Sequence, residues 1–269
     1  MNLASSLTTL KRMARITSSR IPAGTKVTML KATWIARRRS AHPESDIAVH
    51  YPPSTVDLVS DTFYIDYCTL YGLAVDRQFL SDFEGAVVVD IGAHKGYYGA
   101  VALALGAAHV VSFEPASQNF RHLQRAAASL PPGAQTWRTN QRAVGTSDGL
   151  ATLSLSGDSW GHSLLAPVDG EVIGTEQVEL VSLATALEEA AGIAPSSPLI
   201  VKINIEGMAG GLVVGTEVGL WCLVRELWLD VETNDPVPEQ QLVEHLQAAG
   251  LRLRQRAGRL LLFRQGEVR

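Results

Sequence analysis

One apolar run followed by two glycines constrains the fold of this chain more than any other feature. Residues 87–91 read Val-Val-Val-Asp-Ile, and Gly92 and Gly96 follow them. This order predicts a buried parallel strand, a tight turn and the start of a helix. Glu114 follows the next apolar run, so its carboxylate is expected beside the turn, where it can accept hydrogen bonds from two ribose hydroxyls. The pattern predicts a nucleotide site in a doubly wound α/β sheet.

The spacing of the glycines separates two classes of cofactor. A dinucleotide site uses G-x-G-x-x-G, whose middle glycine lets the backbone reach the pyrophosphate. Here only Gly92 and Gly96 are glycine, and Asp90 lies near the end of the strand. A carboxylate there would repel a pyrophosphate but suits the ammonium group of an amino acid. We therefore expect S-adenosylmethionine rather than NAD(P), although glycines of this spacing also serve simply to pack a helix against a strand.

Strand and helix signals alternate along the rest of the chain. We expect strands at 85–91, 108–113, 136–144, 149–156, 178–183, 199–205 and 223–231, a hairpin of 251–256 with 259–264, and helices at 96–105, 117–129, 184–192 and 237–249. Ser117 is the expected N-cap of its helix. Residues 41–60 resemble a connection, 61–82 a helix or cover over the sheet, and 157–177 a loop or lid.

These elements predict an α/β fold with a doubly wound, mostly parallel, seven-stranded Rossmann-like sheet. Its C-terminal antiparallel hairpin is typical of class I methyltransferases. Ligands of such sheets bind at the carboxyl ends of the strands. Six polar side chains that are distant in sequence are therefore expected on one rim: Asp90, Glu114, Asn204, Glu206, Asp230 and Glu232.

The first 60 residues form a predicted basic N-terminal extension, and 61–269 the methyltransferase domain. Residues 1–43 hold nine basic side chains and no acidic one, whereas 44–269 carry a net charge of −13. Leu3, Leu7, Leu10 and Ala14 recur at helical spacing, so an amphipathic helix is expected. It could dock on the acidic body or a second subunit, bind a membrane surface or nucleic acid, or be an organellar presequence. We favour docking, because a surface of opposite sign lies in the same chain.

The two cysteines, Cys68 and Cys222, lie far apart and lack metal-ligand spacing. A disulfide framework and a zinc site are therefore not expected, and the composition fits a reducing cytoplasm. We expect neither a signal peptide nor a transmembrane segment, because no sufficiently long apolar run is evident. A homo-oligomer is compatible with the sequence.

Three segments resemble the FkbM family of S-adenosylmethionine-dependent O-methyltransferases. They are 89–98, 113–115 with Asn119 and Phe120 after it, and 201–207, which matches the family's Lys-x-Asp-x-Glu-Gly motif except at Asn204. The chain also has Ala209 or Gly210 where the family often has an acid, and Ala184 where it commonly has Asp. The resemblance implies methyl transfer to a hydroxyl, often on a sugar or a secondary metabolite.

Site residues follow from the motifs and the expected rim. The predicted cofactor-binding residues are Asp90, Gly92, His94, Gly96, Tyr97, Glu114, Pro115 and Ala143. The predicted acceptor-binding residues are Trp160, Lys202, Asn204 and Glu232.

A sugar hydroxyl is a weak nucleophile, so a base should take its proton during attack. His162 is the first candidate, because histidine titrates near neutral pH. Glu206 and Asp230 are its rivals. Together with Glu232 these two acids would suit Mg²⁺ if all three meet at one point.

Three other functions compete with O-methylation. The basic arm suggests a nucleic-acid methyltransferase, but the position of the Asn/Asp-Pro-Pro-aromatic motif of base methylation reads Asn204-Ile-Glu-Gly, and the acidic body opposes phosphate binding. We therefore do not expect a nucleic-acid partner. An NAD(P) oxidoreductase is disfavoured by the missing glycine. The third alternative is a protein that has the methyltransferase fold but no catalytic activity. Asn204 is the best evidence for this alternative, because an amide cannot serve as a base where the family has Asp.

Overall fold

The computed structural model describes residues 3–38, 42–133, 135–157, 159–165 and 171–266, and it confirms the predicted α/β class. Its main sheet has seven strands in the order β11-β12-β10-β9-β3-β4-β5. The strands are β3 (Val87–Ile91), β4 (His109–Phe113), β5 (Thr136–Asn140), β9 (Leu199–Ile203), β10 (Val224–Asp230), β11 (Leu251–Ala257) and β12 (Leu260–Gln265). Strands β3, β4, β5, β9 and β10 run parallel, and β12 pairs antiparallel with β10 and β11.

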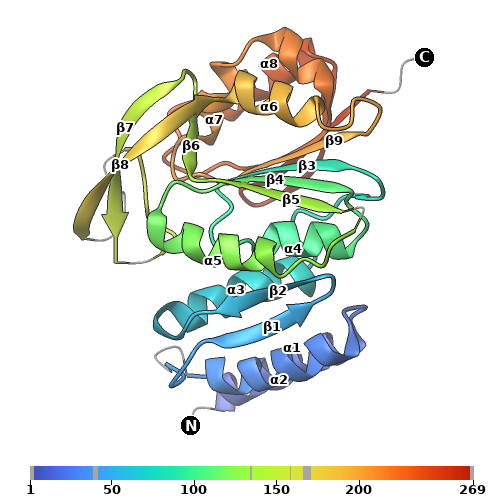
Figure 1. The fold of residues 1–269 in the computed structure, drawn as a ribbon, viewed down its shortest axis with the longest axis vertical. Helices are drawn as coiled ribbons and strands as arrows, with labels where there is room; N and C mark the ends of the chain where they lie inside the picture. The colour runs from blue at the N-terminus through green and yellow to red at the C-terminus, as the bar shows by residue number, and fades with distance from the viewer. Residues whose placement is uncertain (1–2, 39–41, 134, 158, 166–170, 267–269) are drawn as a thin grey trace.

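Helices cover both faces of this sheet (Figure 1). Helices α4 (Tyr97–Ala104) and α5 (Ser117–Ala128) cover one face, and α6 (Leu183–Ala191), α7 (Ala209–Val214) and α8 (Glu239–Ala248) cover the other. All five residues of β3 are buried. Val88 joins the core on the α4 side, whereas Val87 and Val89 join the core on the α6 side. Burial on both faces explains why this strand is almost continuously apolar.

A second sheet of three strands, in the order β6-β8-β7, flanks the first. It consists of β6 (Arg142–Gly145), β7 (Gly149–Ser156) and β8 (Val172–Ser182). Two predictions are corrected here. The strand expected at 136–144 is two strands, β5 and β6, in different sheets. The loop expected at 157–177 already enters β8 at Val172, because β8 pairs with β7 from Val172 to Leu180. Residues 158 and 166–170 of that loop lie outside the described ranges.

Helix α5 begins as predicted, but Ser117 is its first residue and not its N-cap. The cap position is Ala116, which has no side chain for that purpose. The Ser117 backbone N–H and hydroxyl instead donate to the Glu176 carboxylate, at 3.0 and 2.7 Å. A carboxylate from β8 thus takes the place of a local cap and ties the small sheet to α5.

The N-terminal segment contains more structure than the sequence predicts. Helix α1 (Leu3–Ser18) is the expected amphipathic helix, and α2 (Ala23–Ala36) follows it. The expected connection at 41–60 includes a hairpin of β1 (Ile47–Tyr51) and β2 (Ser54–Leu58), which leads through the short helix η1 (Ser60–Thr62) into α3 (Phe63–Ala74). A second short helix, η2 (Val218–Leu223), precedes β10.

The N-terminal elements share a core with the rest of the molecule. Ile16, Met29, Val49, Tyr67 and Tyr97 are fully or almost fully buried in one hydrophobic cluster. Figure 1 shows α1 and α2 as the outermost layer, with β1 and β2 between them and α4 and α5. The domain boundary at residue 60 stays a prediction. In the described ranges, no helix has both the length and the hydropathy needed to cross a membrane.

Candidate active site

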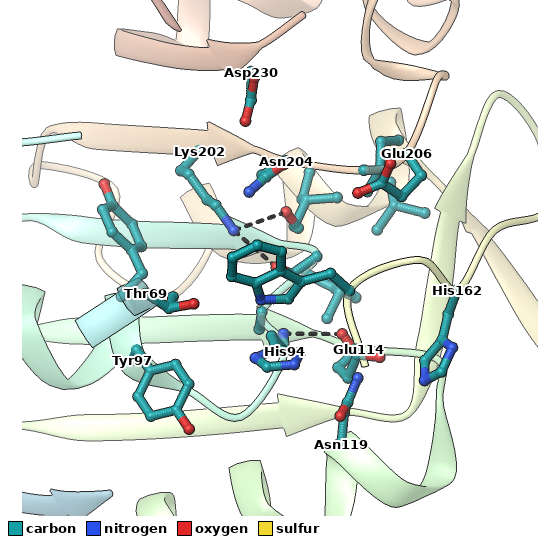
Figure 2. A pocket seen from close by; sticks show the side chains of 18 of the residues that line it. Thr69, His94, Tyr97, Glu114, Asn119, His162, Lys202, Asn204, Glu206 and Asp230 are labelled. Atoms are coloured by element: carbon teal, nitrogen blue, oxygen red, sulfur yellow. Dashed lines mark hydrogen bonds between the residues drawn. The ribbon is translucent and has the colours of Figure 1, made fainter. Parts of the chain in front are cut away.

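A cavity of about 550 Å³ lies at the carboxyl ends of the central strands. Twelve predicted site residues line it: Gly92, His94, Tyr97, Glu114, Pro115, Ala143, Trp160, His162, Lys202, Asn204, Glu206 and Asp230. In the view of Figure 2, Asp230 and Glu206 lie at the top of this cavity, and His94, Glu114 and Asn119 lie below Lys202. Three predicted residues, Asp90, Gly96 and Glu232, are not among those that line it.

The turn after β3 requires glycine at its first position. Gly92 has a φ of +73°, and a Cβ there would lie 2.0 Å from the Asn204 carbonyl oxygen. The ends of β3 and β9 therefore approach too closely for any side chain at this position. Gly96 has a φ of +91° and lies at the N-cap of α4. It shapes the turn through its backbone and does not itself line the cavity.

Glu114 closes the turn from the end of β4. Its Oε2 accepts from the His94 backbone N–H at 2.9 Å, and its Oε1 accepts from the Ala116 backbone N–H at 3.0 Å. Burial raises the pKa of this carboxyl to about 7, against the effect of these two bonds. The Asn119 side chain also hydrogen-bonds this carboxyl, and a carboxylate has about four acceptor sites, so it keeps a lone pair for a ligand.

Asp90 and Lys202 bind each other rather than a ligand. They are neighbours in the register of β3 and β9, and Lys202 Nζ donates to Asp90 Oδ1 at 2.9 Å. The same ammonium also donates to the carbonyl oxygens of Gly92 (2.8 Å) and Ile91 (3.4 Å). Its three protons are thereby directed at the end of β3. This geometry argues against the predicted roles of Asp90 on a ligand ammonium and of Lys202 on the acceptor, because both charges are buried and paired.

His94 and Asn119 point polar atoms into the lower part of the cavity in Figure 2. His94 Nε2 lies 2.9 Å from Ser159 Oγ, and its buried Nδ1 has no partner among the residues that the structure describes. Burial, with Lys95 nearby, holds the His94 pKa well below its ordinary value, so the ring is neutral. Asn119 Nδ2 donates to the Ser159 carbonyl at 3.0 Å, and its Oδ1 is likewise unpartnered within the described ranges. Asn119 and Ser159 are not among the predicted site residues.

The geometry of His162 does not favour its predicted role as a base, which stays a prediction. Its Nδ1 lies 3.1 Å from the backbone N–H of Ser156. A backbone N–H can only donate, so Nδ1 accepts and the proton of the neutral ring is on Nε2. Burial lowers the His162 pKa and favours this neutral form. Neither nitrogen then has a free lone pair, so His162 can donate a hydrogen bond but cannot take a proton in this arrangement.

Glu206 and Asp230 form the acidic side of the cavity. Burial, followed by a hydrogen bond with Glu232 and repulsion from it, raises the pKa of Glu206 to about 7. Asp230 Oδ2 accepts from Arg259 Nη2 at 2.8 Å, and burial raises the pKa of this carboxyl despite the arginine. Glu232 accepts from the other terminal nitrogen of Arg259, at 3.1 Å, and from the Gly207 backbone N–H.

The proposed Mg²⁺ ligands do not meet at one point. In the described part of the chain, the one group of side chains close enough to share an ion is Asp46, Asp57 and His122, outside the cavity. Arg259 instead lies between Asp230 and Glu232 and supplies the positive charge there. The donor set around Glu206 therefore does not fit a divalent cation. Arg259 itself was missed by sequence analysis, because only the β11–β12 hairpin brings it to this rim.

The remaining predicted residues lie at the margins of the cavity. Trp160 is 47% exposed at its mouth. The Tyr97 hydroxyl donates to the Asp57 carbonyl at 2.6 Å and is therefore directed away from a ligand. Pro115 and Ala143 also line the cavity, and neither has a polar side-chain atom. Arg142, whose guanidinium also binds Asn140 Oδ1 at 3.0 Å, lines the cavity and was not predicted.

The sheet order, the glycine turn and the acid after β4 define a class I methyltransferase. The chain belongs to the FkbM methyltransferase family, whose domain model matches residues 90–241, more than half of its length. The chain is therefore a methyltransferase that uses S-adenosylmethionine, as the resemblance in its motifs predicts. No curated protein matches the sequence.

Solved structures of other methyltransferases are similar to this one at low sequence identity. A ribosomal protein L11 methylase of Lactobacillus delbrueckii is 14% identical with a TM-score of 0.37, over 74% of this chain and 79% of its own. Magnesium protoporphyrin IX methyltransferase of Synechocystis is 13% identical with a TM-score of 0.38, over 74% and 77%. Aeropyrum pernix fibrillarin is 12% identical with a TM-score of 0.38, over 68% of each chain.

The residues around the glycine turn fit the cofactor. The cavity is large enough for a nucleoside with an amino-acid chain, since ligand pockets commonly measure about 300–1,000 Å³. Glu114 offers carboxylate lone pairs, and the buried Nδ1 of His94 and Oδ1 of Asn119 lack partners among the described residues. Unpartnered buried polar atoms of this kind are costly unless a ligand or water satisfies them.

Proposed function

We propose that the protein transfers a methyl group from S-adenosylmethionine to a hydroxyl of a sugar, an oligosaccharide or a glycosylated metabolite. The observation that carries this proposal is Glu206, a carboxyl with a pKa of about 7 in the wall of the cavity. A base with a pKa near the working pH combines a large ionised fraction with useful basicity. A hydroxyl acceptor needs such a base.

The cofactor would be held by the glycine turn and the end of β4. Glu114 would accept hydrogen bonds from the ribose hydroxyls, and the backbone around Gly92 would leave room for the rest of the molecule. When bound, S-adenosylmethionine supplies a methyl group already activated on a sulfonium centre. The chain must therefore align the acceptor, exclude water and remove one proton.

The acceptor would lie between the cofactor site and the acidic side of the cavity. Glu206 would take the hydroxyl proton as the oxygen attacks, with Asp230 as the rival base. Asn204 and the Nε2–H of His162 would bind other hydroxyls, because both line the same cavity as Glu206. Trp160 offers an aromatic face at the mouth, where a sugar ring can stack.

Nucleic-acid methylation receives less support. Helices α1 and α2, which carry most of the basic residues of the N-terminal segment, lie in the outermost layer beyond β1 and β2, whereas the cavity rim carries Glu206 and Asp230. Phosphate binding would require unpaired cations at the rim, whereas Arg142 and Arg259 there are paired with acidic side chains.

The test is calorimetric titration of the full chain with S-adenosylhomocysteine, followed by transfer of labelled methyl from S-adenosylmethionine to a panel of oligosaccharides, glycosides and RNA. We expect micromolar product binding, labelled glycan or glycoside, and unlabelled RNA. Labelled RNA with unlabelled glycans would contradict the proposal. Product binding without labelling of any acceptor would favour the non-catalytic alternative.

A further inference from the structure

The apolar stripe of α1 faces away from the protein. Leu7 and Leu10, two residues of the predicted stripe, are 55% and 62% exposed. The helix instead packs inward through Thr9 and Ile16, which are buried on its other side. An amphipathic helix normally buries its apolar stripe. Here Leu7 and Leu10 of the stripe stay more than half exposed.

Helix α2 continues this apolar surface. Val27 and Trp34, two turns apart, are 54% and 53% exposed. Leu10 of α1 and Trp34 of α2 line the same groove, together with Met13. Leu7 lies one turn before Leu10 and Val27 two turns before Trp34, so helical spacing puts each on the same side of its helix as a groove-lining residue. The two helices form the outermost layer of the molecule (Figure 1).

Cations border this apolar groove. Arg37 and Arg38 line it, and the Arg37 guanidinium lies 4.0 Å from the centre of the Trp34 ring. Arg37 Nε is buried and has no hydrogen-bond partner in the part of the chain that the structure describes. Residues 1–43 contain no acidic side chain at all, while the remainder of the chain has a net charge of −13. The N-terminal segment thus carries a net positive charge, and Arg37 and Arg38 lie beside the exposed apolar face, whereas Arg15 pairs with Asp76 of the body.

We propose that the α1–α2 hairpin is a docking surface for an anionic lipid bilayer. Leu7, Leu10, Val27 and Trp34 would enter the boundary between headgroups and acyl chains, and Arg37 and Arg38 would bind lipid phosphates. Helices with an apolar face, interfacial tryptophan and basic neighbours bind membranes in this way. Each basic residue near an anionic surface adds to the attraction.

Two other occupants fit the surface less well. A second copy that docked by the same face would bring Arg37 and Arg38 of both copies together, and like charges oppose such contact. Nucleic acid would satisfy the cations but would leave Leu7 and Leu10 in contact with a polar backbone.

The test is co-sedimentation of the full chain with vesicles of phosphatidylcholine alone or with about 30% phosphatidylglycerol. The double variant Leu10→Ser with Trp34→Ser removes apolar area at the groove. The matched control, Leu150→Ser with Ile173→Ser, changes two side chains that are 76% and 67% exposed on the small sheet. All four positions are exposed, so both variants should fold, which circular dichroism will verify.

We expect the wild type and the control to bind the anionic vesicles and to leave the neutral ones unbound. The groove variant should bind at least about tenfold more weakly, since two partly buried apolar side chains are lost from the lipid contact. No binding of the wild type to anionic vesicles, or equal binding of the groove variant, would overturn the proposal. So would a dimer, seen by light scattering without lipid, that the groove variant dissociates, or binding to DNA that is stronger than binding to vesicles.

Discussion

At the scale of single residues, the acid–base chemistry depends on which lone pairs already accept a hydrogen bond and which remain available to take a proton. His162 was the natural first candidate for a base from its residue type. Its Nδ1 is occupied by the Ser156 backbone N–H, so its one remaining function toward a ligand is donation. Glu206 hydrogen-bonds Glu232, but an ionised carboxylate keeps further lone pairs, and its raised pKa suits proton removal near neutral pH.

Replacing Glu206 by Gln should lower kcat by about 100- to 10,000-fold, the usual contribution of a general base. The affinity for S-adenosylhomocysteine should change little, because Glu206 acts on the acceptor. His162→Ala serves as the control and should lower kcat by less than about tenfold, the effect of one lost hydrogen bond. A reversed ranking of the two variants in steady-state assays would move the base assignment back to His162.

The pH dependence of the rate follows from the same carboxyl. Glu206 must be ionised to take a proton, and its pKa is about 7. We expect kcat at saturating acceptor to rise between pH ~6 and pH ~8 and then level off. The rise should disappear in Glu206→Gln. A wild-type rate that falls over this interval would mean that the essential group acts in its protonated form.

Glu114 should control cofactor affinity. Charge-assisted hydrogen bonds contribute about 1.5–3 kcal/mol each, so Glu114→Ala should weaken S-adenosylhomocysteine binding by at least about 100-fold in calorimetry. Glu179→Ala, which removes an exposed carboxylate on β8, should bind like the wild type. Near-normal affinity of Glu114→Ala would place the ribose elsewhere in the cavity.

At the scale of secondary-structure elements, the Asp90–Lys202 pair joins β3 to β9 beneath the cavity. The two residues are adjacent in the strand register, and their side chains are 0% and 6% exposed. Lys202 also holds the Gly92 carbonyl, so the pair links the glycine turn to the Lys-x-Asn-x-Glu-Gly segment. Its role is to position the turn.

Lys202→Met should lower the free energy of unfolding by about 3–5 kcal/mol, because it leaves the Asp90 carboxylate buried without its partner. The double variant Lys202→Met with Asp90→Asn removes that unpaired charge and should recover part of the loss. Urea denaturation followed by circular dichroism measures both values. A double variant that is less stable than Lys202→Met would show that the Asp90 carboxylate is satisfied by other groups.

At the scale of the whole molecule, the N-terminal helices and the methyltransferase sheet share one hydrophobic cluster. Met29 of α2 is fully buried in it. Met29→Ala should cost about 2–5 kcal/mol and should shift a single thermal transition of the entire chain to lower temperature. Val27→Ala, a change at an exposed position of the same helix, should leave the transition almost unchanged. Two separate transitions, with only the smaller one shifted, would support an independent N-terminal domain ending near residue 60.

Local sequence determined the elements whose signals are contained within a few residues. The apolar run of β3, the glycines at 92 and 96 and the acid at 114 each predict their own conformation, and their order predicts the methyltransferase sheet and its cofactor. The hairpin about Gly258 is equally local, because a φ of +62° there favours glycine. The β1–β2 hairpin was missed because its strands are short and prolines separate them.

Tertiary structure alone decided which side chains meet. Asp90 and Lys202 are 112 residues apart, and only the register of parallel strands makes them a pair. Arg259 reaches Asp230 and Glu232 because an antiparallel hairpin returns it to the rim, and this contact removes the proposed metal site. The outward orientation of Leu7 and Leu10 likewise could not be predicted from helical periodicity. Periodicity identifies an apolar stripe on a helix but not the surface that the stripe contacts. Periodicity and turn chemistry are properties of neighbouring residues, whereas pairing, burial and pKa depend on contacts between segments distant in the chain.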